Sequence, residues 1–136
     1  MDMLFTAEQE AIAGLCAASA CPADQPVTDA VRCVVVDFNR FDPEHVPWHR
    51  RRMELILKVP ALHAHSTLRY REWRDVVADF AATRLGVAAD ELLPQTVAYS
   101  ALGVAVASYE YWLAHPHEVL CEVLDRALHG LSKGLV

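Results

Sequence analysis

Three consecutive arginines give this 136-residue sequence its densest positive charge. They lie in "HRRR", residues 49–52, at the start of a predicted helix. Guanidinium groups bind phosphate through paired N–H donors, so this segment could anchor a phosphate-bearing ligand. It could equally be the solvated first turn of an amphipathic helix whose arginines pair with nearby acids. The sequence leaves both interpretations open.

Glu110 is the other residue whose surroundings raise a chemical question, because it is the only charge between Val97 and Leu113. An unpaired buried carboxylate is very costly, so we expect it to pair with Arg69 or Arg74. General acid–base catalysis needs a second, oppositely tuned group, and the sequence offers none. It also contains no glycine-rich phosphate loop or nucleophile elbow. We therefore expect no catalytic residue, no cofactor and no enzymatic activity.

The histidine and cysteine spacings do not predict a metal site. His63 and His65 are two residues apart, so on a helix they point to nearly opposite faces. His115 and His117 flank a proline, where a turn role is more common. The four cysteines are scattered and form no C-x-x-C pair, whereas a structural zinc site needs clustered ligands. We expect no metal.

Composition limits the compartment and the partners. The first residues lack the basic region and apolar run of a signal peptide, which predicts a cytoplasmic chain with reduced thiols. The segment 97–113 is apolar, but it is rich in small residues and has no basic flanks, so we expect no membrane span. A net charge of −6 disfavours unaided binding to nucleic acid.

Apolar residues recur at intervals of three and four, and proline or glycine separates the periodic segments. This pattern predicts an all-α fold, a bundle of about six helices in a single domain spanning residues 1–136. Thr28 is a candidate N-cap and Gly86 a candidate C-cap. The expected helices cover residues 2–19, 28–41, 48–58, 60–85, 94–114 and 117–131.

The helix expected over residues 94–114 is apolar on two opposite faces. A surface helix needs only one dry face, and a large exposed apolar patch usually marks association. We expect the bulky face, which includes Tyr99 and Leu102, to point inward. The small face and the last helix should then form a four-helix bundle between two subunits of a homodimer. The predicted interface residues are Val97, Ala101, Val104, Ala105, Ser108, Trp112, Leu120, Leu124 and Leu128.

Four motifs occur in an order that resembles a known family. They are "FNRFD" (38–42), "HRRRMELILKVPALHAHS" (49–66), "YREWRDVV" (70–77) and "PQTVAYSALGVAVASYEYWL" (94–113). Together they resemble the regulatory C-terminal domain of TetR-family bacterial transcription repressors, most strongly those of mycofactocin systems. The likeness covers roughly residues 28–132.

The resemblance implies a dimeric repressor domain whose effector, an acyl-coenzyme A, alters the spacing of two DNA-binding domains. A TetR-family protein opens with a three-helix DNA-binding domain that contains a helix-turn-helix. These 136 residues show no such domain, so we expect contact with operator DNA only through a part that they lack. The alternative function is a stand-alone helical dimer acting as an interaction or lipid-carrier module.

A ligand pocket follows as a hypothesis from the inward helix faces, with a solid core as its alternative. Pockets between helices are mostly apolar with a few polar anchors. We expect the acyl chain to be surrounded by Phe38, Met53, Leu57, Trp73, Val77, Tyr99 and Leu102, with Arg50, Arg51 or Arg52 near the mouth.

Overall fold

The computed structural model describes residues 25–134 and shows no strand among them. This confirms the all-α prediction. Five of the six expected α-helices are present, with bounds that differ from the predicted ones by at most three residues, while the first, residues 2–19, lies outside the described residues. The elements are α2 (Val27–Phe38), the 3-10 turn η2 (Pro43–His45), α3 (Val46–Lys58), α4 (Pro60–Leu85), α5 (Leu92–Ala114) and α6 (Leu120–Ser132).

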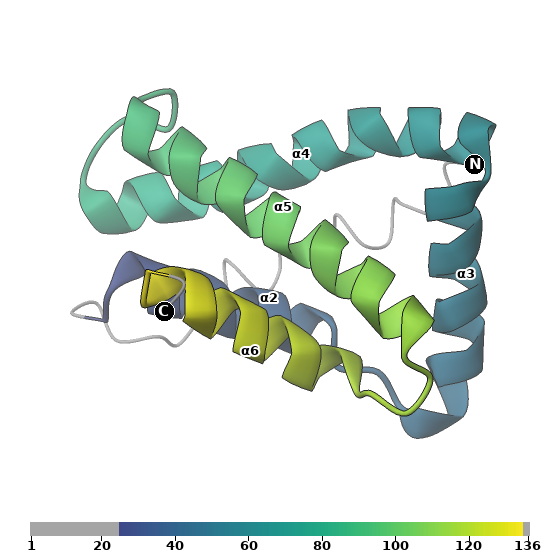
Figure 1. Cartoon of the computed structure of the whole chain (residues 1–136). Coiled ribbons are helices and arrows are strands. Elements are labelled where there is room, and N and C mark those ends of the chain that lie inside the picture. The colour runs from purple at the N-terminus through teal and green to yellow at the C-terminus, as the bar shows by residue number, and fades with distance from the viewer. Residues whose placement is uncertain (1–24, 135–136) are drawn as a thin grey trace.

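The helices form two layers closed at one end. Helix α5 crosses the molecule between α4 on one side and the pair α2 and α6 on the other, and packs against α4 and α6 (Figure 1). Helix α3 stands across one end and contacts both α4 and α5 (Figure 1). Side chains from α2, α3, α4 and α5 therefore converge on one region, where a ligand site would be bounded by four helices.

Proline and glycine set the bounds of α4, as the sequence predicts. Val59 precedes Pro60 and is extended, with φ −87° and ψ 115°, because a proline disfavours helical backbone in the residue before it. Gly86 ends the helix with φ 68°, a left-handed conformation that costs glycine little. Thr28 is not an N-cap, since α2 already begins at Val27, directly after a proline.

Asn39 ends α2 earlier than predicted. The expected end was Phe41, but the backbone N–H of Asn39 donates to the Val36 carbonyl and its side-chain amide donates to the Val35 carbonyl at 2.9 Å. The Tyr109 hydroxyl of α5 donates to Asn39 Oδ1 at 3.1 Å. All the side chains in this link are buried, so it fixes the end of α2 against α5.

Removal of this link gives a first prediction. Tyr109→Phe should lower the free energy of unfolding by about 1 kcal/mol, because the buried amide oxygen of Asn39 loses a donor. Tyr111→Phe is the matched control, since the Tyr111 hydroxyl is exposed and lies 3.5 Å from Glu118. Urea unfolding followed by circular dichroism measures both. Equal stability of the two variants would contradict a role for the link.

Small side chains allow α4 and α5 to approach closely. The distance between packed helices depends on the residues at their contact, and alanines permit the shortest separations. Both helices bury alanines in the core, each no more than 5% exposed: Ala78, Ala81 and Ala82 of α4, and Ala98, Ala101 and Ala105 of α5.

The small face of α5, which the sequence assigned to a second subunit, thus lies inside the protomer. The prediction was right that this face admits a neighbouring helix, but helices of the same chain cover it. Val97 and Val104 are half-buried. The other seven predicted interface residues are buried within one protomer: Ala101, Ala105, Ser108, Trp112, Leu120, Leu124 and Leu128.

Candidate functional site

A cavity of about 40 Å³ lies among α2, α3, α4 and α5. One wall is apolar, and polar groups from α3, α4 and α5 reach into the same space. Its lining residues are Phe38 of α2; Arg52, Met53 and Ile56 of α3; Arg69, Tyr70 and Trp73 of α4; and Leu102, Ala105 and Tyr109 of α5.

Four of the seven apolar residues predicted to line a pocket meet in this cavity, namely Phe38, Met53, Trp73 and Leu102. They come from four different helices, so the fold gathers them from across the chain. Met53 and Trp73 are each less than a tenth exposed, which places them firmly on the inside.

The other three predicted apolar residues lie elsewhere. Val77 is buried one turn beyond Trp73 and belongs to the solid core. Leu57 borders a separate surface hollow beside Glu110. Tyr99 is 58% exposed, with the guanidinium of Arg74 over its ring at 4.2 Å, which corrects the expectation that it points inward.

The three arginines of α3 have three different surroundings, because successive helical residues point about 100° apart. Arg52 is only 5% exposed and lines the cavity. Arg51 is exposed and pairs with Glu54 at 3.2 Å. Arg50 points toward the end of α5. Of these three arginines of α3, only Arg52 is therefore placed to contact a molecule in the cavity.

Arg50 fastens α3 to the connection between α5 and α6. Its guanidinium donates to the Trp112 carbonyl at 2.7 Å, to the Pro116 carbonyl at 3.1 Å and to the Glu118 carbonyl at 3.2 Å. It also lies over the Trp112 ring at 4.2 Å, and burial lowers its pKa. The expectation of a ligand anchor at Arg50 does not fit this geometry, in which backbone carbonyls occupy its donors.

His49 directly precedes these arginines on α3, and its ring is mainly uncharged. Its ring stacks on Phe41 with centroids 3.5 Å apart. Burial lowers its pKa, and the nearby Arg52 and His45 lower it further. Since the ordinary value is near 6.5, the ring is mainly neutral at pH 7. It therefore does not add to the positive charge at Arg52.

Arg69 and Tyr70 line the cavity although the sequence analysis did not select them. They precede Trp73 by four and three residues, and residues at those spacings share a helix face. The signal is therefore present in "RYREW" (69–73), once Trp73 is placed inward. Tyr109 and Ile56 also line the cavity and are not among the predicted pocket residues.

Glu110 is exposed, so the expected partner among the arginines of α4 is not required. Arg69 pairs instead with Glu72 at 3.1 Å, and Arg74 lies on Tyr99. The prediction was wrong because it assumed that every side of α5 is covered. In the protomer, the face that carries Glu110 meets solvent.

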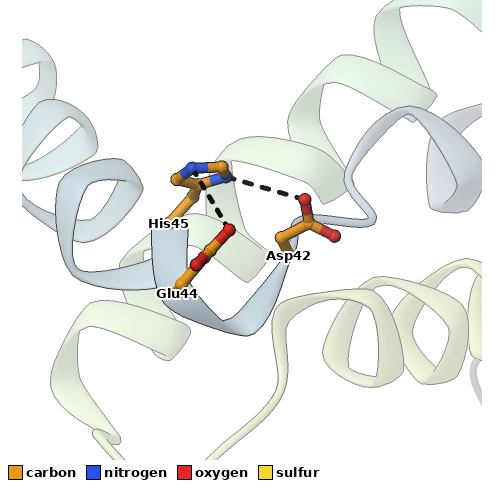
Figure 2. A group of neighbouring side chains, drawn as sticks. All are labelled: Asp42, Glu44 and His45. Atoms are coloured by element: carbon orange, nitrogen blue, oxygen red, sulfur yellow. Dashed lines mark ion pairs between the residues drawn. The ribbon is translucent and has the colours of Figure 1, made fainter.

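An exposed acidic cluster lies on the η2 turn. His45 is 3.8 Å from Asp42 through Nδ1 and 3.8 Å from Glu44 through Nε2 (Figure 2). All three side chains are exposed, and ion pairs account for their arrangement. We assign no metal to this group, since exposed ion-paired acids are common without one.

A larger hollow of about 250 Å³ lies at the other end of α5, between α2 and α6. It includes the half-buried Val97 and the hydroxyl-bearing residues Thr28, Thr96, Ser100 and Ser132, and none of the described residues that line it is charged. Ligand sites combine apolar walls with a few convergent polar groups. The cavity at Arg52 combines apolar walls with charged side chains and gathers four of the seven predicted apolar residues, so it is the candidate site.

Among residues 25–134, no helix combines the length and the apolar character that crossing a bilayer requires. This finding agrees with the sequence-based expectation for the segment 97–113.

Comparisons with known proteins give the family. Residues 25–136 match the family model described as the MftR C-terminal domain, a TetR-type domain. The chain is 42% identical over 107 residues to a Mycobacterium tuberculosis protein named as a mycofactocin biosynthesis transcriptional regulator, MftR. That match covers 79% of this chain and 54% of the relative, so the chain spans about half the relative's length. The chain therefore belongs to the TetR family of transcriptional regulators, as a C-terminal domain of the MftR type.

Proposed function

We propose that this domain senses an effector in the cavity among α2, α3, α4 and α5, and that effector binding controls DNA binding by a dimeric repressor. The observation that carries the proposal is the convergence of Phe38, Met53, Trp73 and Leu102 from four helices on one cavity. Apolar effectors bind in such sites between helices. DNA contact belongs to a part of the repressor outside these residues.

The effector has an apolar body, and an acyl-coenzyme A is the candidate that the sequence resemblance implies. At about 40 Å³, the cavity holds only a few water molecules, so an acyl chain has to displace its walls. Met53 is suited to such a change, because an unbranched thioether side chain adapts its shape easily. The effector would therefore bind by moving α3 relative to α4 and α5.

Arg50 supports a mechanical coupling between the cavity and the connection from α5 to α6. It lies on the same helix as Met53, and its three carbonyl acceptors lie at or just after the end of α5. A displacement of α3 would therefore shift the connection between α5 and α6. In a dimer built on α5, that shift alters the relation between subunits.

The outward face of α5 is our proposed dimer contact. TetR-family regulators typically dimerise. Gly103 and Ala107 are exposed on this face, and a Cβ added at Gly103 would meet no atom within 4 Å. The outward positions of α6 are polar by contrast. This contact replaces the seam that the sequence analysis placed on the opposite face of α5.

A chain-length series tests the proposed function. Isothermal titration with acyl-coenzyme A of increasing length should show affinity rising about fourfold for each CH₂ buried, until the cavity is full. Leu102→Trp should weaken binding by filling the cavity, while Leu68→Trp, on an exposed position of α4, should not. A flat series with wild-type protein would contradict an apolar effector site.

A further inference from the structure

We propose that each subunit of the dimer inserts Tyr99 into a surface hollow of the other, and that Arg74, which lies on this ring, pairs with Glu110 of the partner subunit. The inference rests on the proposed function, in which the outward face of α5 is the dimer contact. It adds the residues that fix the two subunits relative to one another. The observations that carry it are an exposed tyrosine, an exposed carboxylate and a hollow on one face of α5.

Tyr99 and Arg74 form a projection on the outward face of α5. The tyrosine is 58% exposed, and the guanidinium of Arg74 lies over its ring at 4.2 Å. Within residues 25–134, Arg74 forms no ion pair. Tyrosine and arginine are among the residue types that contribute most to binding energy between proteins. This pair is therefore suited to a contact with a second subunit.

A hollow of about 290 Å³ lies toward the other end of α5, where α3 stands across it (Figure 1). The described residues that line it are Leu57 and Lys58 of α3 and Glu110, Leu113 and Ala114 of α5. A space of about 150 Å³ suffices to hold benzene, so an aromatic ring fits here. Glu110 is exposed, and no cation of the described residues, Lys58 included, forms an ion pair with it. The hollow therefore offers apolar walls to a ring and a carboxylate to a cation.

A two-fold axis brings the projection of one subunit to the hollow of the other. At about 100° per residue, Tyr99, Ala107 and Glu110 all point within about 40° of the direction of Gly103. Gly103 and Ala107 lie midway between Tyr99 and Glu110 along this face. In a two-fold contact, residue i of one subunit meets residue j of the other, and j meets i. If two antiparallel copies of α5 cross at Gly103 and Ala107, each Tyr99 therefore faces the hollow beside Glu110 of the partner subunit.

The charges also match in this antiparallel arrangement. Arg74 accompanies the tyrosine and Glu110 borders the hollow, so each of the two equivalent contacts joins a cation to an anion. Two parallel copies of α5 would instead place like charges side by side, which disfavours an interface. The pair therefore selects the direction of the partner helix as well as the contact itself.

Charge reversal tests the pair on the 136-residue chain, with sedimentation equilibrium as the measurement. Arg74→Glu and Glu110→Arg should each weaken the dimer at least about tenfold, because each places like charges together across the contact. The double variant Arg74→Glu/Glu110→Arg restores opposite charges and should bind within about threefold of the wild type. Tyr99→Ala leaves the hollow empty and should also weaken the dimer at least about tenfold, which provides a second test if a reversed charge disturbs the fold.

Asp79→Arg is the matched control, because Asp79 is exposed on α4 but points about 140° away from Arg74, so the dimer should keep its affinity. A double variant that dimerises no better than the single reversals would overturn the pair. Ala107→Glu separates the inference from the proposed dimer contact. If it is monomeric while Tyr99→Ala and both single reversals stay dimeric, the inference fails and the contact stands. If Ala107→Glu also stays dimeric, both fail.

Discussion

Arg50→Ala is expected to lower the free energy of unfolding by about 3 kcal/mol, far more than an average surface substitution. The variant removes three hydrogen bonds to the carbonyls of Trp112, Pro116 and Glu118, together with the packing of the guanidinium on the Trp112 ring. Each bond involves a charged donor, and the Trp112 carbonyl is left without it in a partly buried position. Urea unfolding monitored by circular dichroism measures the loss.

Two variants isolate the cause. Arg51→Ala removes an exposed ion pair of the same helix and should change stability by less than about 1 kcal/mol. Arg50→Lys keeps the charge but cannot reach three carbonyls with one ammonium, so it should recover less than half of the loss. If Arg50→Ala were as stable as Arg51→Ala, α3 would not be fastened to the α5–α6 connection.

Ala107→Glu is expected to convert the proposed dimer into a folded monomer, while Ala105→Glu should prevent folding. The two alanines lie on opposite faces of α5. Ala107 is exposed on the proposed dimer face, and Ala105 is 1% exposed within the protomer. A glutamate at the proposed seam places two like charges together, whereas a glutamate at Ala105 leaves an unpaired carboxylate in the core.

Light scattering gives the mass, and circular dichroism gives the fold. The wild type should have twice the 15.1 kDa mass of one chain, and Ala107→Glu should have that mass once. A dimeric Ala107→Glu would exclude the outward face as the contact. A folded, monomeric Ala105→Glu would restore the interface that the sequence analysis assigned.

The sequence predicted the bounds of α4 because local chemistry decides them. Pro60 and Gly86 act through their own backbone preferences, and no distant residue needs to be known. The end of α2 could not be predicted from local sequence in the same way. Asn39 stops the helix through a cap that Tyr109 reinforces from 70 residues away, and periodicity carries no record of such a contact.

The orientation of α5 could not be predicted from its pattern. Both of its faces are apolar, so hydrophobic periodicity does not distinguish them. Bulk does not identify the inward face, because α4 also presents buried alanines, Ala78 and Ala81, and the two helices pack through their small faces. The match between the two small faces depends on both helices and cannot be read from α5 alone. This is why Tyr99, predicted inside, is exposed, while the predicted interface residues of α5 are buried or half-buried in the protomer.

The arginines of α3 show a site that sequence reasoning found in part. "HRRR" was recognised as a possible anion anchor, yet all three arginines were treated alike. Arg52 shares a helix face with Ile56, because residues four apart point only about 40° away from each other. That spacing could have singled it out. The role of Arg50 could not be predicted, since its acceptors are backbone atoms far along the chain.

The acceptors of Arg50 have a consequence for how this domain can vary. All three are main-chain carbonyls, which every amino acid supplies. Substitutions at His115 and His117 can therefore leave the fastening intact, provided that the turn keeps its backbone path. The contact therefore requires a particular side chain at position 50 but no particular side chain at the acceptor residues. These hydrogen bonds therefore constrain the backbone path of residues 115–119 rather than the identity of their side chains, whereas at position 50 they require a guanidinium.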